Sequence, residues 1–425
     1  MKTQYLGTYY TILLVITALL GEQIVSISIG PQLSPFRIVL LFAPIVILKE
    51  KQNYSVIKRR ESYPYVAFLL FWVLYSLLLL PLLNDYSAFG QYLYFLVSAL
   101  ITSVFVSKYI CSKESFFKIF SLFEWVALFM ALIGLYEIVT GDYHFVNENS
   151  LDYYESRSEL NSTLGIRVPI SAFGNPNDFS LFLLFSICIS NMLSHIKKSK
   201  VGRLLSSILS IFLVIMVVST QSRAAFISML LFLVLLFVDS YNHLKKRTKV
   251  FLILSLVASS SYIVSWIADN QELYEALITI DLNASEGSDY MRINLIRNGF
   301  VFLLNSGFMG VGLGNIEYHM AHSALYDTEG ILNIHNWWME ILVSSGLMVF
   351  IWYVSLYVTK LFRSFKAMRQ TDYNDVLHFY YRCILSLLFV FILGSTSSSS
   401  NFTKEWQWAM FAVVFAFPTK IIRHE

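Results

Sequence analysis

The amino-acid sequence predicts an all-α protein, a polytopic bundle of about twelve transmembrane helices with a large extracytoplasmic loop cap. Of its 425 residues, 56% are hydrophobic and 14% are charged, which leaves too little polar surface for a soluble globule of this size. The apolar residues form about a dozen runs of roughly 17 to 24 residues, long enough to cross a hydrocarbon core as helices. Period-two alternation is absent, which disfavours a β-barrel.

The apolar runs set the positions of the predicted spans. We expect them near residues 8–28, 36–48, 64–83, 88–107, 117–140, 177–196, 204–220, 224–240, 250–267, 337–359, 378–398 and 405–419. The second run is short and contains Pro44, so we expect an irregular segment there. The first run ends without a small-x-small cleavage motif, and we interpret it as a retained span. Residues 1–425 should therefore form a single membrane domain.

Positive charge is distributed unevenly between the two sides of these spans. If the N-terminus is cytoplasmic, the inner segments hold 24 of the 31 Lys and Arg residues. The outer side then receives only Arg37, Arg157, Arg167, Arg223, Arg292, Arg297 and Lys404. Because cytoplasmic loops of membrane proteins are enriched in positive charge, this pattern predicts that both termini are cytoplasmic.

Two predicted outer loops are much longer than the other connections. They span residues 141–176 and 268–336, and the second is the longest polar stretch in the chain. The first ends in Gly174–Asp178, a turn and N-cap pattern for the next helix. The second should form a cap with short surface helices. Long loops on a rigid scaffold often carry function, so we expect the functional residues on this side.

The basic residues on the outer side are mostly arginine. Arginine presents a planar fork of donors that suits phosphate oxygens, whereas lysine is a point charge. This choice favours an anionic ligand on the outer face. Arg223 lies in Thr220–Arg223, a minimal turn between two very apolar helices, so its position is closely specified. It either contacts such a ligand or reaches toward the lipid headgroups.

Arg292 and Arg297 lie in a stretch that predicts an amphipathic helix on the membrane surface. Five positions separate two side chains by about 140° around a helix, so both cannot point at one site. We expect one of them to meet a ligand and the other to meet headgroups. The spacing alone does not decide which.

His335 and Asn336 precede the helix that begins at Trp337, and Glu340 lies in its first turn. A histidine here can act as a general base or hydrogen-bond donor near neutral pH. The alternative is a His-Asn pair that only caps the helix. Glu137, near the outer end of the fifth span, is a further candidate because a carboxylate in that position is costly without a partner.

Other motifs are interpreted as structural. The glycine run Gly310–Gly314 lacks the preceding strand and the following Lys-Ser/Thr of a phosphate loop, so it indicates close packing or a tight turn. His319 and His322 lack a suitably spaced carboxylate, and the three cysteines show no CxxC or Cys/His spacing. We expect neither a metal site nor disulfide bonds.

Several of these patterns together resemble the O-antigen ligase and O-antigen polymerase superfamily of bacterial membrane glycosyltransferases. The matching segments are Asn175–Asn177 before a helix, Thr220–Ala224 between two spans, Arg292 leading through Ser306–Phe308 into the glycine run, and His335–Asn336 followed by Gly346. The family pattern places nine residues between the His-Asn pair and a Gly-x-x-Gly motif. Nine residues separate Asn336 from Gly346, but Val349 replaces the final glycine. The resemblance covers residues 170 to 350.

The resemblance implies that a glycan is transferred from an undecaprenyl diphosphate carrier to an acceptor hydroxyl, without metal, nucleotide or other cofactor. The reaction would occur at the outer face of the bacterial cell (inner) membrane. Arg223 and Arg292 match the positions that stabilise the diphosphate leaving group, and His335 matches the histidine that activates or orients the acceptor. Further substrate contacts would come from Asn336, Glu340, Arg297 and Arg167.

Three functions compete for these features. The first is a polymerase that joins lipid-linked repeat units into an O-antigen or capsule type polysaccharide. The second is a ligase that moves finished glycan to lipid A-core or another acceptor. The third is a transporter, which predicts paired broken helices in two halves of the chain, and the sequence shows no such symmetry. The expected partners are the lipid-linked oligosaccharide, the bilayer, and flippase and chain-length regulator proteins. No nucleic acid is expected.

Overall fold

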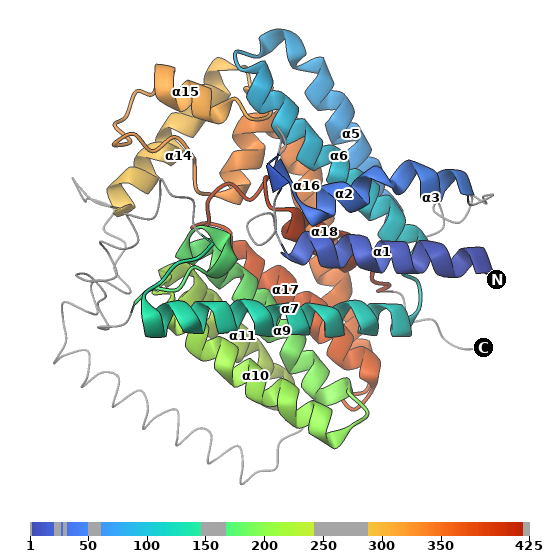
Figure 1. The fold of residues 1–425 in the computed structure, drawn as a ribbon. Coiled ribbons are helices and arrows are strands. Elements are labelled where there is room, and N and C mark those ends of the chain that lie inside the picture. The colour runs from blue at the N-terminus through green and yellow to red at the C-terminus, as the bar shows by residue number, and fades with distance from the viewer. Residues whose placement is uncertain are drawn as a thin grey trace, which may run out of the picture.

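The computed structural model describes residues 2–20, 27–28, 32–49, 61–145, 167–241 and 288–419. Within these ranges the regular secondary structure is helical apart from one short antiparallel pair, β1 (Ile27–Ser28) and β2 (Gln32–Leu33). The prediction of an all-α bundle is confirmed (Figure 1). The predicted ninth span, 250–267, and residue Arg157 lie outside the described residues.

The helices follow the predicted apolar runs closely. In chain order they are α1 (Lys2–Leu20), α2 (Pro35–Leu41), α3 (Ala43–Lys49), α5 (Tyr63–Leu78), η1 (Leu80–Leu82), α6 (Tyr86–Tyr109), α7 (Lys113–Thr140), η2 (Ser171–Phe173), α9 (Pro176–Ile196), α10 (Lys200–Ser219), α11 (Arg223–Tyr241), α14 (Ser288–Asn305), α15 (Ile316–Ser323), α16 (Trp337–Gln370), α17 (Val376–Gly394) and α18 (Glu405–Ala416). Helix α16 continues well beyond the predicted end at residue 359.

Seven of the described helices are long and apolar enough to cross a membrane, namely α6, α7, α9, α10, α11, α16 and α17. The apolar parts of α1 and α5 are shorter, and α18 has only 12 residues. The predicted second span consists of two seven-residue helices, α2 and α3, joined at Phe42. The structure therefore supports a multi-pass membrane protein, but the prediction of about twelve spans is not confirmed.

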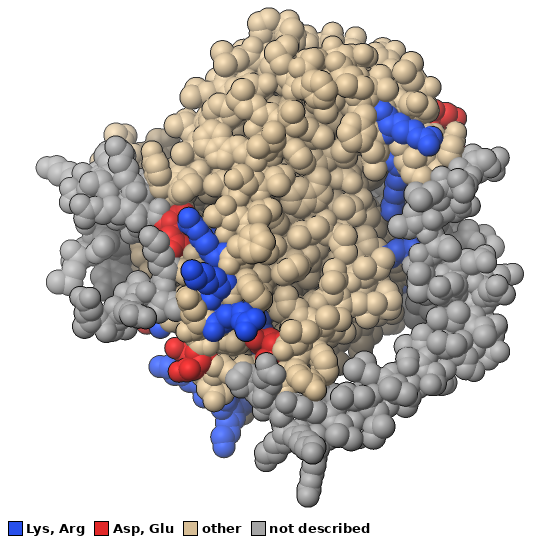
Figure 2. Space-filling model, turned by 180° about the vertical axis from the view of Figure 1, so that it is seen from behind, with Lys and Arg blue, Asp and Glu red and all other residues tan. Residues whose placement is uncertain are grey.

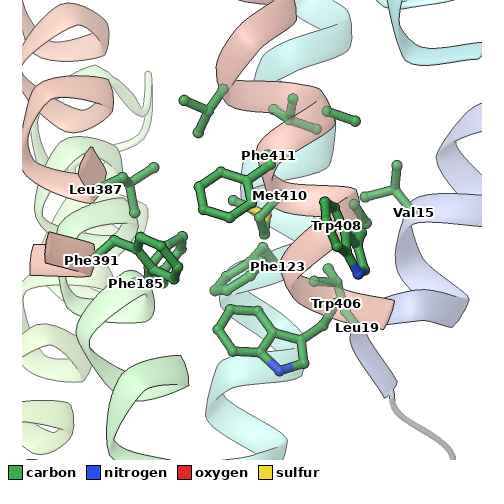
Figure 3. Close-up of a cluster of buried hydrophobic side chains, with 14 of the residues drawn as sticks. Val15, Leu19, Phe123, Phe185, Leu387, Phe391, Trp406, Trp408, Met410 and Phe411 are labelled. Atoms are coloured by element: carbon green, nitrogen blue, oxygen red, sulfur yellow. The ribbon is translucent and has the colours of Figure 1, made fainter. Parts of the chain in front are cut away.

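Helix α18 forms part of the packed centre of the bundle. Its residues from Glu405 to Phe415 are buried on every face. Figure 3 shows its aromatic side chains between those of α1, α7, α9 and α17. The Phe411 ring meets Phe391 edge to face at 4.8 Å, and Trp406 meets Phe185 at 5.5 Å. Such packing holds the start of α18 in a fixed place at one end of the bundle.

Helices α10 and α11 lie at the periphery. Of the residues in their most apolar stretches, 28% and 22% are buried, compared with 78% in α9. Leucine and isoleucine side chains cover their outward faces, which indicates contact with lipid. On the face shown in Figure 2, a broad area without charged side chains separates two groups of Lys and Arg. This arrangement is typical of a protein surrounded by a hydrocarbon core.

Helix α16 is broken at Gly346, and the glycine run enters the break. Gly346 has a left-handed φ of 80°, and a Cβ atom there would lie 2.3 Å from the Met309 carbonyl oxygen. The backbone N–H groups of Val311 and Gly312 donate to the carbonyls of Val343 and Ser344, each at 2.9 Å. The glycine run thus supplies hydrogen-bond donors to two α16 carbonyls that have no helical partner at the break. The prediction of close packing or a tight turn at Gly310–Gly314 agrees with this geometry.

Helix α14 confirms the predicted helix around Arg292, and it packs against the first half of α16 (Figure 1). Its polar side chains hold the segment that follows α15. The Asn298 amide nitrogen donates to the Tyr326 carbonyl at 2.8 Å, and its oxygen accepts from the N–H groups of Leu325 and Tyr326. Asn294 donates to the Asp327 carbonyl at 2.8 Å. Helix α14 and its loop therefore form one packed unit beside α16.

Candidate functional site

The sequence-predicted site lies at the end of the bundle where α9 and α16 begin, which we call the outer end. His335 stands immediately before the first turn of α16. Its φ of 49° is left-handed, a costly conformation for a residue other than glycine. Its backbone N–H donates to the Asn333 side chain at 2.9 Å, which holds it in place. Backbone strain of this kind is concentrated at active sites and ligand-binding residues.

The imidazole of His335 lies among charged groups from three other parts of the chain. Burial lowers its pKa below the ordinary value of 6.5. The Asp178 carboxylate and a hydrogen bond with the Ser398 backbone oppose this effect, whereas the charges of Arg292 and Lys404 reinforce it. The net result is an imidazole that is neutral near pH 7 and able to accept a proton.

Asp178 and Lys404 form an ion pair that joins α9 to the segment before α18. The Lys404 ammonium lies 2.5 Å from the Asp178 carboxylate, and the two side chains are 11% and 3% exposed. Asp178 also accepts from the Asn175 amide at 2.6 Å and from the Ser399 backbone N–H at 3.0 Å. Burial lowers the pKa of Lys404, and the Asp178 carboxylate opposes that shift. The pair is therefore a fixed, mutually neutralised feature next to His335.

The turn that carries Ser398 is held from the opposite side by Glu340. This buried carboxylate accepts hydrogen bonds from the Ser400 hydroxyl and from the Asn401 backbone N–H, the latter at 3.2 Å. The Tyr92 hydroxyl donates to Ser400 at 3.3 Å. Both carboxylate oxygens of Glu340 therefore accept hydrogen bonds from the protein itself. Its predicted role as a supporting polar group would be exerted through this turn.

Asn336 caps α16, with its side-chain oxygen accepting from the N–H groups of Trp338 and Met339 at 3.1 and 3.2 Å. The capping alternative therefore holds for Asn336, while His335 contributes no cap. Near the outer end of α7, the predicted fifth span, the Glu137 carboxylate also accepts backbone hydrogen bonds. Glu137 accepts from the N–H groups of Ile170 and Ser171, each at 2.8 Å, and so fixes η2 beside α9.

The predicted arginines occupy different surroundings. Arg292 is half-buried, and its charge acts on His335. Arg297 instead lies over the Tyr326 ring at 5.5 Å and donates to Asn294 at 3.4 Å. The two arginines therefore have different surroundings, and the charge of Arg292 acts on the candidate site. Arg223 is the first residue of α11, after a turn in which Gln221 has a left-handed φ of 56°.

Arg167 lies beside the C-terminal end of α7, where its guanidinium donates to the Val139 carbonyl at 3.4 Å. Asp178 and Lys404 were not singled out as site residues by sequence reasoning. A signal for both existed, because Asp178 follows the predicted N-cap and Lys404 is a basic residue on the predicted outer side. Among the residues that the structure describes, no group of three or more His, Cys, Asp or Glu side chains is placed to hold a metal ion.

The fold and the site together define a polytopic helical membrane protein with a buried polar centre at one end of the bundle. Residues 208–354 match the sequence model of the O-antigen ligase family. The chain is also 25% identical over 360 residues to the teichuronic acid biosynthesis protein TuaE of Bacillus subtilis strain 168, covering 83% of this chain and 70% of that relative. The two matches confirm the resemblance to the O-antigen ligase and polymerase superfamily. They support a membrane protein of polysaccharide biosynthesis in the cell envelope.

Proposed function

We propose that this protein is a glycosyltransferase that polymerises undecaprenyl-diphosphate-linked repeat units into a surface polysaccharide. The observation that carries the proposal is the convergence of His335, Arg292 and the Asp178–Lys404 pair at the outer end. A proton acceptor and a fixed cation beside it are what transfer from a diphosphate to a hydroxyl requires. The relative named for teichuronic acid biosynthesis supports a polysaccharide product.

In this proposal the bond between the donor sugar and the carrier diphosphate breaks as the acceptor oxygen attacks. Arg292 and Arg223 stabilise the negative charge that develops on the departing diphosphate. His335 takes the proton of the acceptor hydroxyl, for which its neutral state is suited. Arg297, Arg167, Asn336 and Glu340 are proposed as groups that contact the substrate or support those that do. No step requires a metal or a cofactor.

The ligase remains the second candidate, because the matching family model carries the O-antigen ligase description. In that case the same residues would transfer finished glycan to lipid A-core or another acceptor. The two reactions use the same donor chemistry and differ in the acceptor. Flippase and chain-length regulator proteins are proposed partners of the polymerase.

Deletion of the gene tests the proposed function. Surface glycan is profiled by gel, and lipid-linked intermediates are extracted from the same cells. A polymerase predicts single repeat units on the carrier, with one unit still reaching the surface. Full-length polymer on the carrier would indicate the ligase instead, and an unchanged profile would contradict both candidates.

We also propose that both termini are cytoplasmic and that the outer end faces away from the cytoplasm, as the charge distribution predicts. Single cysteines introduced at positions 325 and 365, in a variant without the natural cysteines, test this orientation. An impermeant thiol reagent added to intact cells should label position 325 and spare position 365. The reverse pattern would contradict the orientation.

A further inference from the structure

A cavity of about 170 Å³ lies at the outer end, beside the Asp178–Lys404 pair. Its walls come from the end of α1, from η2, from the start of α9 and from residues 399–406. An engineered cavity of about 150 Å³ in another protein holds a benzene molecule. The space here is therefore large enough for one six-membered ring.

The lining of this cavity combines polar and aromatic groups. The polar side chains include Asp178, Thr403, Lys404 and Glu405, and the aromatic ones are Phe173 and Trp406. Carboxylates, an ammonium group and a hydroxyl offer both donors and acceptors to sugar hydroxyls. Aromatic surface suits the apolar C–H face of a pyranose ring, as is usual in pockets with few but specific polar groups.

The charges around the cavity are already compensated. Lys404 is neutralised by Asp178 at 2.5 Å, and Glu405 is paired with Arg37 at 3.3 Å. A diphosphate would need cations that are not already engaged with carboxylates. The cavity therefore suits a polyhydroxylated ring better than it suits the carrier phosphates.

One side chain that lines the cavity has a buried donor with no hydrogen-bond partner among the described residues. The indole N–H of Trp406 is unpartnered, although the residue is only 3% exposed. The indole N–H groups of Trp72, Trp337, Trp338 and Trp408 each donate to a protein oxygen at 2.8 to 3.1 Å. This N–H is itself enclosed by protein atoms, so we assign the contribution of Trp406 to the cavity to its aromatic surface.

We propose that this cavity is a subsite for one sugar ring of the acceptor glycan, separate from the site of the carrier diphosphate. The proposal rests on the transfer reaction proposed above. The Asp178–Lys404 pair borders the cavity and also acts on the His335 imidazole. A ring held there places the acceptor chain beside the group that takes its proton, with Arg292 as the other cation near that group.

Binding of oligosaccharides to the full-length protein in lipid nanodiscs tests the subsite. The probe is a set of short oligosaccharides made by partial acid hydrolysis of the organism's own surface polysaccharide. Binding is measured by saturation-transfer NMR. Ala172→Leu, which fills the cavity, should abolish binding. Thr403→Val removes a hydroxyl at nearly constant size, and Trp406→Phe replaces the indole with a smaller aromatic ring; each should weaken binding about tenfold.

Matched controls lie outside the cavity. Thr396→Val removes a hydroxyl that bonds the Leu393 carbonyl, and Trp125→Phe alters an exposed tryptophan on α7. Both should bind like the wild type. Undiminished binding in Ala172→Leu and Thr403→Val, or no binding by the wild type, would overturn the subsite.

The Arg292→Ala variant tests this proposal separately from the proposed function. If both are correct, Arg292→Ala binds the oligosaccharides normally and makes no polymer. Cavity-dependent binding together with normal polymer in Arg292→Ala would keep the sugar subsite and reject the proposed leaving-group chemistry.

Discussion

The two ends of the helix bundle both contain buried charges, but the charges are used differently. At the inner end, where α9 and α11 finish and α17 begins, Asp239 accepts from His378 at 3.0 Å and from Arg382 at 3.2 Å. Arg382 also donates to Asn191 at 3.1 Å. Three helices are fastened together by groups that engage one another.

At the outer end the polar groups border a cavity. His335 is held in a left-handed conformation, and the Asp178–Lys404 pair borders a cavity. Backbone strain at a polar residue is a feature that folding alone does not favour. The difference indicates that the inner network serves stability and the outer one serves binding and chemistry. Four predictions test this contrast.

The largest effect is expected from the outer arginines. Arg292→Ala and Arg223→Ala should each lower polymer formation by about 10²- to 10³-fold, as expected when one stabilising group is removed from a developing charge. Amounts of protein in the membrane should not change. The measurement is gel profiling of glycan in the deletion strain complemented with each variant. Normal chain length in both variants would remove the leaving-group assignment.

The inner network should show the opposite behaviour. Asp239→Asn weakens the hydrogen bonds to two basic side chains and should lower stability by about 1.5–3 kcal/mol per bond weakened. Thermal unfolding of the purified protein in detergent measures this loss. Polymer formed per folded molecule should stay at the wild-type value. A fall in specific activity comparable to that of Arg292→Ala would break the proposed division between the two ends.

The pH profile provides a smaller but more specific test. The reacting imidazole must be neutral, so the rate should rise as pH rises through the His335 pKa, which lies below 6.5, and then level off. Asp178→Asn removes a negative charge and should move the midpoint to lower pH. Lys404→Met removes a positive charge and should move it to higher pH. The same midpoint in all three proteins would exclude His335 as the titrating group.

The smallest effect is expected at Arg297. It lies over the Tyr326 ring at 5.5 Å, a cation–π contact of about 0.5–1 kcal/mol at an exposed site. Arg297→Ala should therefore retain most of the polymer while lowering thermal stability slightly. Loss of polymer as complete as in Arg292→Ala would contradict this supporting role and make Arg297 as important to the transfer as Arg292.

The sequence was sufficient to predict the positions of most helices, because their apolar runs are long and uninterrupted. It was less reliable where burial in protein replaces contact with lipid. Helix α18 is apolar and looks like a span, yet it is only 12 residues long and buried on every face. The predicted span 337–359 runs unbroken across Gly346, so the break there and its partner segment at Met309–Gly312 are known only from the structure.

The candidate site was predicted in part. His335 and Arg292 carry recognisable local signals, such as an unusual charge on the outer side and a motif spacing. Asp178 and Lys404 lie 226 positions apart, and only the packing of α9 against α17 and α18 brings them together. Periodicity and charge counts cannot reveal such a pair, because they describe each segment separately.

The most direct test of the account is polymer formation by the purified protein in lipid vesicles, with lipid-linked repeat units extracted from the deletion strain as the substrate. Wild-type protein and Asp239→Asn should convert single units into longer carrier-linked chains. Arg292→Ala and His335→Ala should leave the units unchanged. Conversion by these two variants at the wild-type rate would contradict the assignment of the chemistry to the outer end.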